Sequence, residues 1–418
     1  MSLALSAAIF AVTLALIFTH PRGMNEAVAA GIGAAAMLAF RIISPGDLAQ
    51  IIGETANVLL FLFGMMLVTA VAEAAGVFDA LAVVAARSAR DDGRLLLVNV
   101  FLLGTVVTAF LSLDVTIIVV TPIVYTLTDK LEIDPLPYLF ACAFVANTAS
   151  LFLPISNLTN ILIYDLLHLS FARFALVMVG PNLAALTVNI GLFFVIFRRR
   201  IPRHIPTGHL TATARPPGFA VAATGLGAVL LGLLAFGFAG LPLAVPACVG
   251  AVALCGAALA RRQIAVQRLN AGIAWPLFAF VPAMFAVIRG VEATWLPRLP
   301  ALSASDGLPN LLLVAFGTAI GANLVNNIPM IAAMIGLLRG TGATIPDHLA
   351  FATLIGTNIG PSVLTFGSLA TMLWLALVRK RGVPVTAGAY TRIGLLVTPP
   401  MLLAATLALW LVLRVSPR

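Results

Sequence analysis

The chain contains the stretch ANTASLFLPISNL at residues 146–158 and a related stretch, TNIGPSVLTFGSL, at residues 357–369. Asn147 aligns with Asn358, and Leu153 aligns with Leu364. Asn, Ser, Thr, Gly and Pro interrupt helices, and a lipid bilayer tolerates the freed backbone groups only where the break is buried in protein or lines a cavity. Corresponding breaks in two halves are typical of a transporter built from repeats, with its substrate site near the membrane midplane.

The composition assigns the chain to a membrane. Apolar residues make up 61% and charged residues 9%, which is too little charge for the surface of a soluble globule. The sequence shows no Walker motif, nucleophile elbow or metal-ligand cluster, so we expect neither an enzyme nor a cofactor. The three cysteines lie in apolar stretches without a disulfide or zinc spacing. Loops facing anionic membrane lipid account for the net charge of +9, so no nucleic-acid partner is expected.

Apolar stretches predict an all-α polytopic membrane protein with about ten transmembrane helices. They cover residues 2–19, 24–41, 56–73, 137–166, 171–197, 218–238, 242–260, 273–291, 348–378 and 393–413. Two further stretches, 95–128 and 308–338, are too long for one helix and have polar residues at their middle. We interpret them as re-entrant hairpins, each followed by one of two broken helices. The two repeats are then inverted relative to each other.

The predicted organisation alternates scaffold and core segments. Residues 1–94 form N-terminal scaffold helices, 95–200 the first repeat core, 201–217 a cytoplasmic linker, 218–307 the second scaffold helices, and 308–418 the second repeat core. Most of the 24 Lys and Arg fall in loops that are cytoplasmic if the N-terminus lies outside. We therefore expect a multi-pass protein of the bacterial inner membrane, with both termini outside.

Asp114 is the carboxylate at the centre of a long apolar stretch. Acids within a membrane mark ion paths and proton relays, so Asp114 can carry a proton or coordinate a cation. The other interpretation is a cap that accepts from backbone amides near Thr116. We interpret three other charged residues as structural: Glu54 as a first-turn residue of the third span, Glu73 as a helix-end residue, and Arg289 as a side chain that reaches the membrane surface.

Amides and hydroxyls at the breaks and at the second hairpin tip form the predicted substrate site, because they both donate and accept hydrogen bonds. They suit a neutral hydroxyl-rich ligand or an anion better than a cation. Helix starts at the breaks add positive dipole ends. The predicted substrate-binding residues are Asn147, Thr148, Ser150, Ser156, Asn157, Asn160, Asn323, Asn326, Asn327, Asn358, Ser362, Thr365 and Ser368. Asp114 precedes Asn147, and Asn327 precedes Asn358, by nearly the same number of residues.

Specific motifs extend over nearly the whole chain. They are LD at 113–114, TPIV at 121–124, TASL at 148–151, SNLTN at 156–160, NNIP at 326–329, GP at 360–361 and GSLATMLW at 367–374. With these motifs the chain resembles the ArsB-type arsenite/antimonite efflux permeases, in the ion transporter superfamily that includes sodium-coupled divalent-anion symporters. The resemblance implies export of the neutral trihydroxide of As(III) or Sb(III) in exchange for protons, driven in some members by an attached cytosolic ATPase.

The chain departs from the family pattern within the site. The family usually carries Asn where this chain has Leu113, Asp where it has Asn358, and Lys where it has Ser362. The acid and base of the second repeat are thus both absent, which leaves Asp114 as the central titratable group. Two functions stay open: a metalloid hydroxide/proton antiporter, and a sodium- or proton-coupled transporter of a small organic or inorganic anion. The sequence also leaves open whether the chain forms a homodimer.

Overall fold

The computed structural model describes residues 2–205, 216–295, 303–339 and 346–415, and throughout these residues the regular structure is helical. Seven helices within them are long and apolar enough to cross a membrane, and shorter apolar helices accompany them. The predicted all-α membrane fold is confirmed. The predicted linker 201–217 falls largely at 206–215, outside the described residues.

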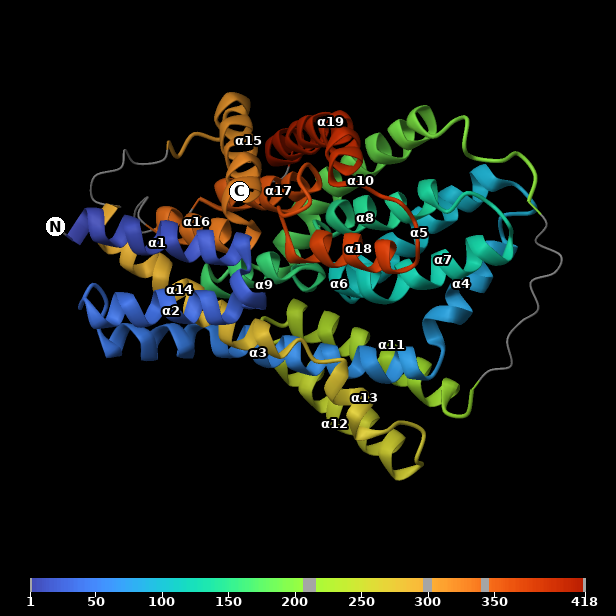
Figure 1. Cartoon of the computed structure of the whole chain (residues 1–418), viewed down its shortest axis with the longest axis horizontal. Coiled ribbons are helices and arrows are strands. Elements are labelled where there is room, and N and C mark those ends of the chain that lie inside the picture. The colour runs from blue at the N-terminus through green and yellow to red at the C-terminus, as the bar shows by residue number, and fades with distance from the viewer. Residues whose placement is uncertain (1, 206–215, 296–302, 340–345, 416–418) are drawn as a thin grey trace.

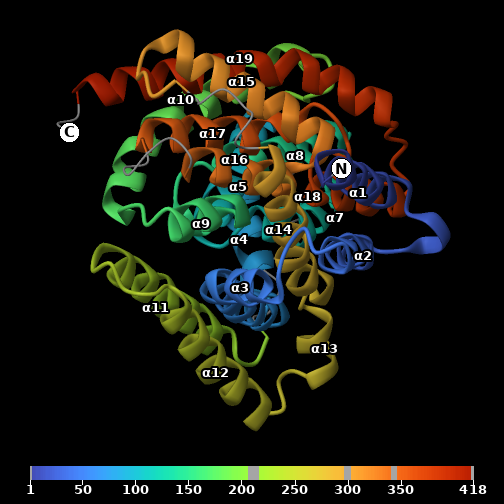
Figure 2. The same ribbon diagram turned by 90° about the vertical axis from the view of Figure 1, so that its left-hand side faces the viewer.

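One set of helices, here called the peripheral group, lies beside the rest of the molecule. It comprises α1 (Ser2–Thr19), α2 (Glu26–Ala39), α3 (Pro45–Ala74), α11 (Phe219–Phe238), α12 (Ala244–Ala260), α13 (Val266–Ala271) and α14 (Trp275–Trp295). Helix α3 packs along α12, and α14 packs along α2. Seen from the end that carries the N-terminus, α3 lies between the α11–α12 pair and the other helices (Figure 2). The group therefore combines segments from both halves of the sequence.

Most of the remaining helices form the core (Figure 1). From the first half it takes α5 (Gly93–Phe110), α6 (Leu113–Val115), α7 (Thr121–Lys130), α8 (Leu136–Ala149), α9 (Leu158–Leu166) and α10 (Phe171–Ile196). The second half contributes α15 (Leu308–Val325), α16 (Asn327–Arg339), α17 (Asp347–Ile359), α18 (Leu369–Lys380) and α19 (Ala387–Val415). The short α4 (Val77–Arg87) connects α3 to the core.

Both long polar-centred stretches form helical hairpins, as predicted. The first turns at Leu111 and Ser112 and returns through α6, a π-helical segment at Thr116–Val120, and α7. A 2.8 Å hydrogen bond between the hydroxyls of Thr108 and Thr116 joins its two arms. The second turns at Asn326, whose φ of 74° is unusual for a residue other than glycine. Asp114 thus lies in the first turn of the returning arm, just past the tip.

The two related sequence stretches are helix breaks. The first broken helix stops at Ala149 and resumes as α9 after Asn157, whose side chain accepts from the Thr159 amide at 3.3 Å. The second stops at Ile359 and resumes as α18 after Ser368, whose hydroxyl accepts from the Thr371 amide at 3.2 Å. Each restart therefore has an N-cap that satisfies one of its free amides.

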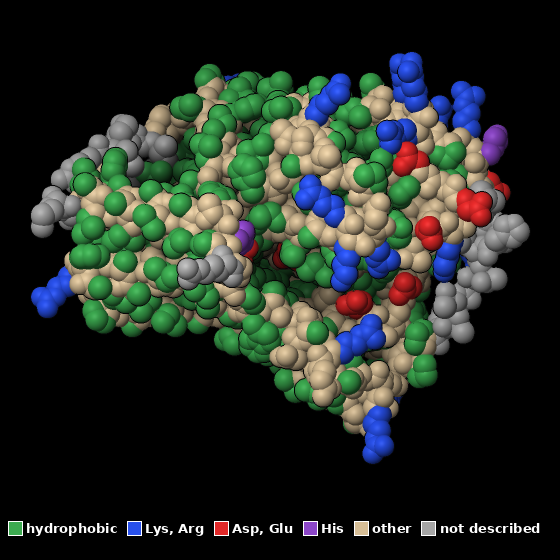
Figure 3. Space-filling model, viewed as in Figure 1, with side chains coloured by type: hydrophobic (Ala, Val, Ile, Leu, Met, Phe, Trp, Pro, Cys, Tyr) green, Lys and Arg blue, Asp and Glu red, His purple; other side chains and the backbone are tan. Residues whose placement is uncertain are grey.

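The two hairpins open toward opposite ends of the molecule. At one end, here called the basic end, Tyr138 at the start of α8 donates to the carbonyl of Gly93 at the start of α5, at 3.0 Å. The hydroxyl of Tyr125, in α7, donates at 3.1 Å to the carbonyl of Arg381, which follows α18. Lys and Arg side chains gather on this side (Figure 3, right). The two arms of the first hairpin therefore meet the basic end.

The opposite end carries the outer parts of the second hairpin. Arg339, at the end of α16, donates to the carbonyl of Leu166 at the end of α9, at 3.1 Å. Arg173 in α10 pairs with Asp347 at the start of α17. The hydroxyls of Ser6 and Thr294 lie 2.7 Å apart, so α1 starts there too. The second repeat is thus inverted relative to the first.

Two features differ from the sequence prediction. Helix α3 begins at Pro45, well before the predicted start at residue 56, so Glu54 lies inside the helix and not in its first turn. Arg289, which the sequence predicts to reach the membrane surface, also pairs with Glu54 and Glu292. The amphipathic α4 and the short α13 were not predicted, because neither is long enough to resemble a span.

Candidate functional site

The side chain of Asn358 lies where the two helix breaks meet. Its Oδ1 accepts from Asn157 Nδ2 and from Thr159 Oγ1, both at 2.6 Å, and its Nδ2 donates to Asn160 Oδ1 at 2.6 Å. Asn358 is only 1% exposed. Three residues of the first repeat thus satisfy one amide of the second repeat.

A further hydrogen bond joins the two breaks. Asn147 Nδ2, in the first repeat, donates to Ser362 Oγ, in the second, at 3.0 Å. Ser150 Oγ donates to the carbonyl of Asn147 at 2.7 Å, and Asn160 Nδ2 donates to the carbonyls of Ser150 and Leu153. These side chains are buried, so we call Asn147, Ser150, Asn157, Thr159, Asn160, Asn358 and Ser362 the central cluster. Its bonding groups are all uncharged amides, hydroxyls and carbonyls.

Each hairpin tip is attached to the break of its own repeat. In the first repeat, Ser156 Oγ donates to the carbonyl of Ala109 at 2.9 Å, and the Phe110 and Phe152 rings meet edge to face. In the second, Asn323 Nδ2 donates to the carbonyl of Gly360 at 2.7 Å while its Oδ1 accepts from the Leu364 amide at 3.0 Å. Both tips are thereby held beside the central cluster.

The second tip has two further bonds to its break. The backbone amide of Asn327 donates to the carbonyl of Gly367 at 3.2 Å, and Asn326 Nδ2 donates to the carbonyl of Phe366 at 3.4 Å. Ser368 caps α18 and shares a 3.0 Å hydroxyl contact with Thr371. Thr365 lies in the same break, is partly exposed, and makes no side-chain hydrogen bond within the described chain.

Two side chains at the tips keep polar atoms unbonded in the described part of the chain. The Asp114 carboxyl group, which is partly buried, accepts no hydrogen bond; Ser112, not Asp114, accepts from the Val115 amide. The Asn327 side-chain amide is also unbonded, although the residue is only 7% exposed. These two residues hold corresponding places in the two repeats. The capping interpretation of Asp114 is therefore not supported by the hydrogen bonds of the hairpin.

Thr148 belongs to a neighbouring polar group that the sequence analysis did not foresee. Its Oγ1 accepts from Asn189 Nδ2 at 2.9 Å, and its carbonyl accepts from Asn182 Nδ2 at 2.8 Å. Both asparagines belong to α10. The Thr148 hydroxyl lies 3.5 Å from the sulfur of Met401 in α19. Single amides in an otherwise apolar span were the only signal for this group.

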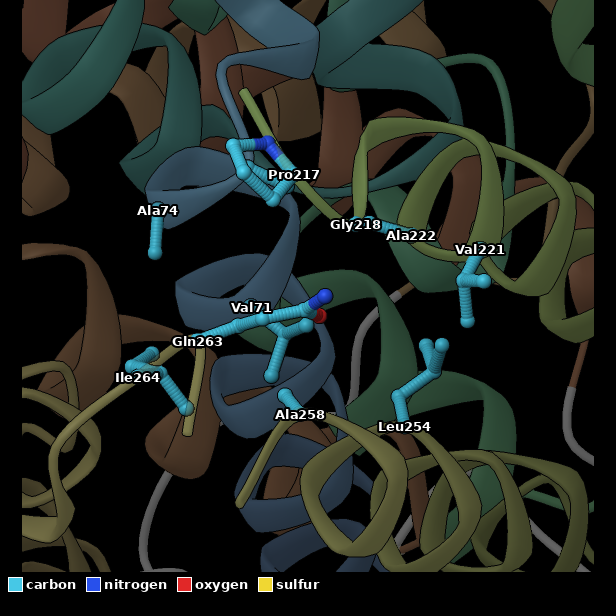
Figure 4. A pocket seen from close by; sticks show the side chains of 11 residues that line it. Val71, Ala74, Pro217, Gly218, Val221, Ala222, Leu254, Ala258, Gln263 and Ile264 are labelled. Atoms are coloured by element: carbon cyan, nitrogen blue, oxygen red, sulfur yellow. The ribbon is translucent and has the colours of Figure 1, made fainter. Parts of the chain in front are cut away.

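A small pocket lies at the basic end of the peripheral group, apart from the breaks (Figure 4). Val71 and Ala74 of α3, Val221 of α11 and Leu254 of α12 line it together with Gln263. Gln263 carries the one polar side chain among the residues that line it. The central cluster is therefore the better candidate for binding a polar substrate.

Comparisons with known proteins agree with this architecture. A family model described as a citrate transporter matches residues 11–356. An arsenical pump membrane protein of Yersinia enterocolitica is 30% identical over 99% of this chain and 99% of its own length. The chain belongs to the arsenical pump membrane protein family. Another arsenical pump membrane protein, from Escherichia coli strain K12, is 29% identical over 97% of this chain and 98% of its own length.

Membership of the arsenical pump membrane protein family confirms the resemblance seen in the sequence motifs and makes the chain a multi-pass membrane transporter, not an enzyme. The solved structure of the Alcanivorax borkumensis YdaH transporter, described as having an unusual topology, shares the fold. Its TM-score is 0.56 at 16% identity, with 90% of each chain covered. The likeness at this identity concerns the fold alone.

Proposed function

We propose that the chain exports arsenite and antimonite, as neutral trihydroxides, from the bacterial cytoplasm in exchange for protons. The observation that carries the proposal is the chemistry of the central cluster. Around Asn358, each described hydrogen-bonding partner is an uncharged amide or hydroxyl. A neutral solute with three hydroxyls can donate to and accept from such groups without bringing a charge into a dry site.

Binding of the trihydroxide would exchange protein hydrogen bonds for bonds to the substrate. The Asn147–Ser362 bond and the bonds to Asn358 all cross between repeats, so a solute placed between the breaks would take over donors and acceptors from both. The unbonded amide of Asn327 offers further groups beside the same break. A site whose polar groups are otherwise mutually satisfied discriminates against solutes that leave any of them unpaired.

Asp114 is proposed as the proton carrier. Asp114 follows the tip of the first hairpin, and the α5 arm of this hairpin is bonded to the first break through the Ala109 carbonyl. Asp114 is the acidic residue near the tips of the two hairpins. A carboxyl group that alternates between protonated and charged states exchanges a proton for each passage of a neutral solute. The absence of a protein partner for Asp114 among the described residues leaves the carboxyl group available for this exchange.

The alternative is import of a small organic or inorganic anion coupled to sodium or protons. It is favoured by the starts of α9 and α18 at the two breaks, where the positive ends of helix dipoles meet the site, and by the description of the matching family model. This alternative requires that an anion bind without a cationic side chain in the central cluster.

Uptake into energised everted membrane vesicles separates the two functions. The proposal predicts accumulation of radiolabelled arsenite that a protonophore abolishes and that needs no sodium. Vesicles from cells carrying the empty vector give the background. Arsenite uptake at background level, together with sodium-dependent uptake of an anion such as citrate in right-side-out vesicles, would replace the proposal by the alternative.

A further inference from the structure

A cluster of charged groups, separate from the central cluster, lies where the peripheral group meets the core. Glu54 of α3 is at its centre: Oε2 lies 3.7 Å from Arg289 Nη2 of α14 and 3.3 Å from Arg339 Nη1 of α16. Arg289 Nε lies 3.9 Å from Glu292 Oε2, one turn along α14. The four side chains are 20–36% exposed. We call Glu54, Arg289, Glu292 and Arg339 the ionic cluster.

The ionic cluster spans the boundary between the peripheral group and the core, which also pack against each other through α14 and α16 and through α3 and α9. Glu54 and Arg289 belong to the peripheral group, whereas Arg339 belongs to the second hairpin of the core. Arg339 also donates to the carbonyl of Leu166, at the end of the first broken helix. One guanidinium group therefore holds α3 of the peripheral group, the second hairpin and the first broken helix together.

Two neighbouring contacts cross the same boundary. Asn57 Nδ2 of α3 donates to Asp165 Oδ1 of α9 at 2.7 Å. The Glu292 carboxylate lies against the bare Cα face of Gly336 in α16, where any side chain would meet it. Helix α16 is thus seated against α14 through a glycine, one turn before Arg339.

We propose that the ionic cluster is a latch that holds the core against the peripheral group at the end opposite the basic end, and that it opens in each transport cycle. This inference rests on the proposed function, because an exporter must open the central cluster toward the outside. Charge patterning places the basic end in the cytoplasm and the latch outside. Half-buried ion pairs suit the task, because an unpaired charge is costly while the interface is closed and is hydrated once the two sides separate.

A cysteine reporter tests the latch without any substrate. Ala332 lies one turn before Gly336 on the same face of α16 and is 2% exposed. In a chain whose Cys142, Cys248 and Cys255 are replaced by alanine, Ala332→Cys should react slowly with a membrane-impermeant maleimide added from the outside. Glu54→Gln or Arg339→Gln should speed this labelling at least about fivefold, the lower end of typical coupling between conformational states.

The matched control is Arg173→Gln. Arg173 pairs with Asp347 at the same end and with similar exposure, but both residues belong to the core. Labelling of Ala332→Cys should therefore stay at the parent rate. In the double variant Glu54→Gln/Arg339→Gln the acceleration should be smaller than the product of the two single accelerations, because both single variants remove the Glu54–Arg339 pair.

Unchanged labelling in Glu54→Gln and Arg339→Gln, or equal acceleration by Arg173→Gln, would overturn the latch. Size-exclusion chromatography in detergent confirms that each variant is folded, and Glu292→Gln tests the same cluster if either fails. Arsenite uptake is measured separately on the parent chain. If the parent chain shows no arsenite uptake, the proposed function is refuted. The labelling rates test the latch alone.

Discussion

Asn358 and Ser362 are the residues through which the second break meets the first. Asn358 satisfies Asn157, Thr159 and Asn160 at once, and Ser362 accepts from Asn147. An asparagine can fill this place because it donates and accepts from one flat group. The ArsB-type permeases that the sequence resembles usually have an acid and a base at the positions of Asn358 and Ser362. In this chain both residues are neutral, so the break carries no net charge.

Restoring only the acid should harm the protein. Asn358→Asp removes the donor to Asn160 and places a carboxylate at a 1% exposed position. An uncompensated buried charge costs about 3–5 kcal/mol. We therefore expect a marked loss of thermal stability in detergent, and recovery of most of it in Asn358→Asp/Ser362→Lys. Thr365→Asp, in the partly exposed part of the same break, is the control that should remain stable. A fully stable Asn358→Asp protein would contradict this account of the central cluster.

Asp114 should be essential for active transport but not for folding. Asp114→Asn keeps the shape of the side chain and removes its proton exchange, so we expect protonophore-sensitive arsenite uptake to fall at least about tenfold. Asp129→Asn, an exposed position on the returning arm of the same hairpin, should transport like the parent. Uptake in energised everted vesicles, corrected for the amount of protein, is the measurement. Parent-level uptake by Asp114→Asn would show that another group carries the proton.

Helices α15 and α17 meet through small residues. Gly356 and Gly360 are four residues apart, and a Cβ at either would strike α15: the Thr318 side chain and the Ala315 carbonyl at Gly356, and the Ala319 backbone at Gly360. Such spacing lets helix backbones approach closely in a membrane. The contact positions the second hairpin beside the second break, so the close approach of these two helices shapes the site.

Filling this contact should separate the two helices. We expect Gly356→Ala to cost about 1–3 kcal/mol of stability, because backbone atoms of α15 cannot move aside as a flexible side chain can. Gly317 also lies on α15, but no described atom lies within 4 Å of a Cβ added there, so Gly317→Ala should be neutral or slightly stabilising. Thermal unfolding of the two purified variants, followed by circular dichroism, makes the comparison. Equal melting temperatures would contradict the close α15–α17 contact.

The breaks and hairpins could be predicted because their signals are local. Asn157, Pro154 and Gly360 interrupt apolar stretches in the sequence itself, and the excess length of the two hairpins is visible there as well. The ion pairs of Glu54 could not be predicted in this way. A charge near the apparent start of a span resembles an interfacial residue, and its partners Arg289 and Arg339 lie in the other half of the chain. Pairing over that separation leaves no local pattern.

The site was predicted in part for the same reason. The structure brings together five of the predicted residues, all of which belong to the two helix breaks: Asn147, Asn157, Asn160, Asn358 and Ser362. Their detailed pairing depends on how two repeats of opposite direction cross, which no single stretch encodes. Whether these residues bind the substrate remains a prediction.

The whole molecule has two chemically different ends. Lys and Arg gather at the basic end (Figure 3). The start of α1 and the ionic cluster lie at the other end. The distribution predicts that the basic end faces the cytoplasm. In a chain whose own cysteines are replaced, Ser305→Cys should react with an impermeant maleimide from outside intact cells. Ser88→Cys should react only after the membrane is opened. The reverse pattern would invert the proposed direction of transport.

Exchange of a neutral metalloid for protons is tested most directly in proteoliposomes. The purified chain is reconstituted with a pH-sensitive dye inside, the vesicles are loaded with arsenite, and they are diluted into arsenite-free buffer at equal pH. The account predicts that outward arsenite flow acidifies the lumen, and that Asp114→Asn abolishes this signal. Arsenite efflux without a change in lumenal pH, or acidification that persists in Asp114→Asn, would contradict it.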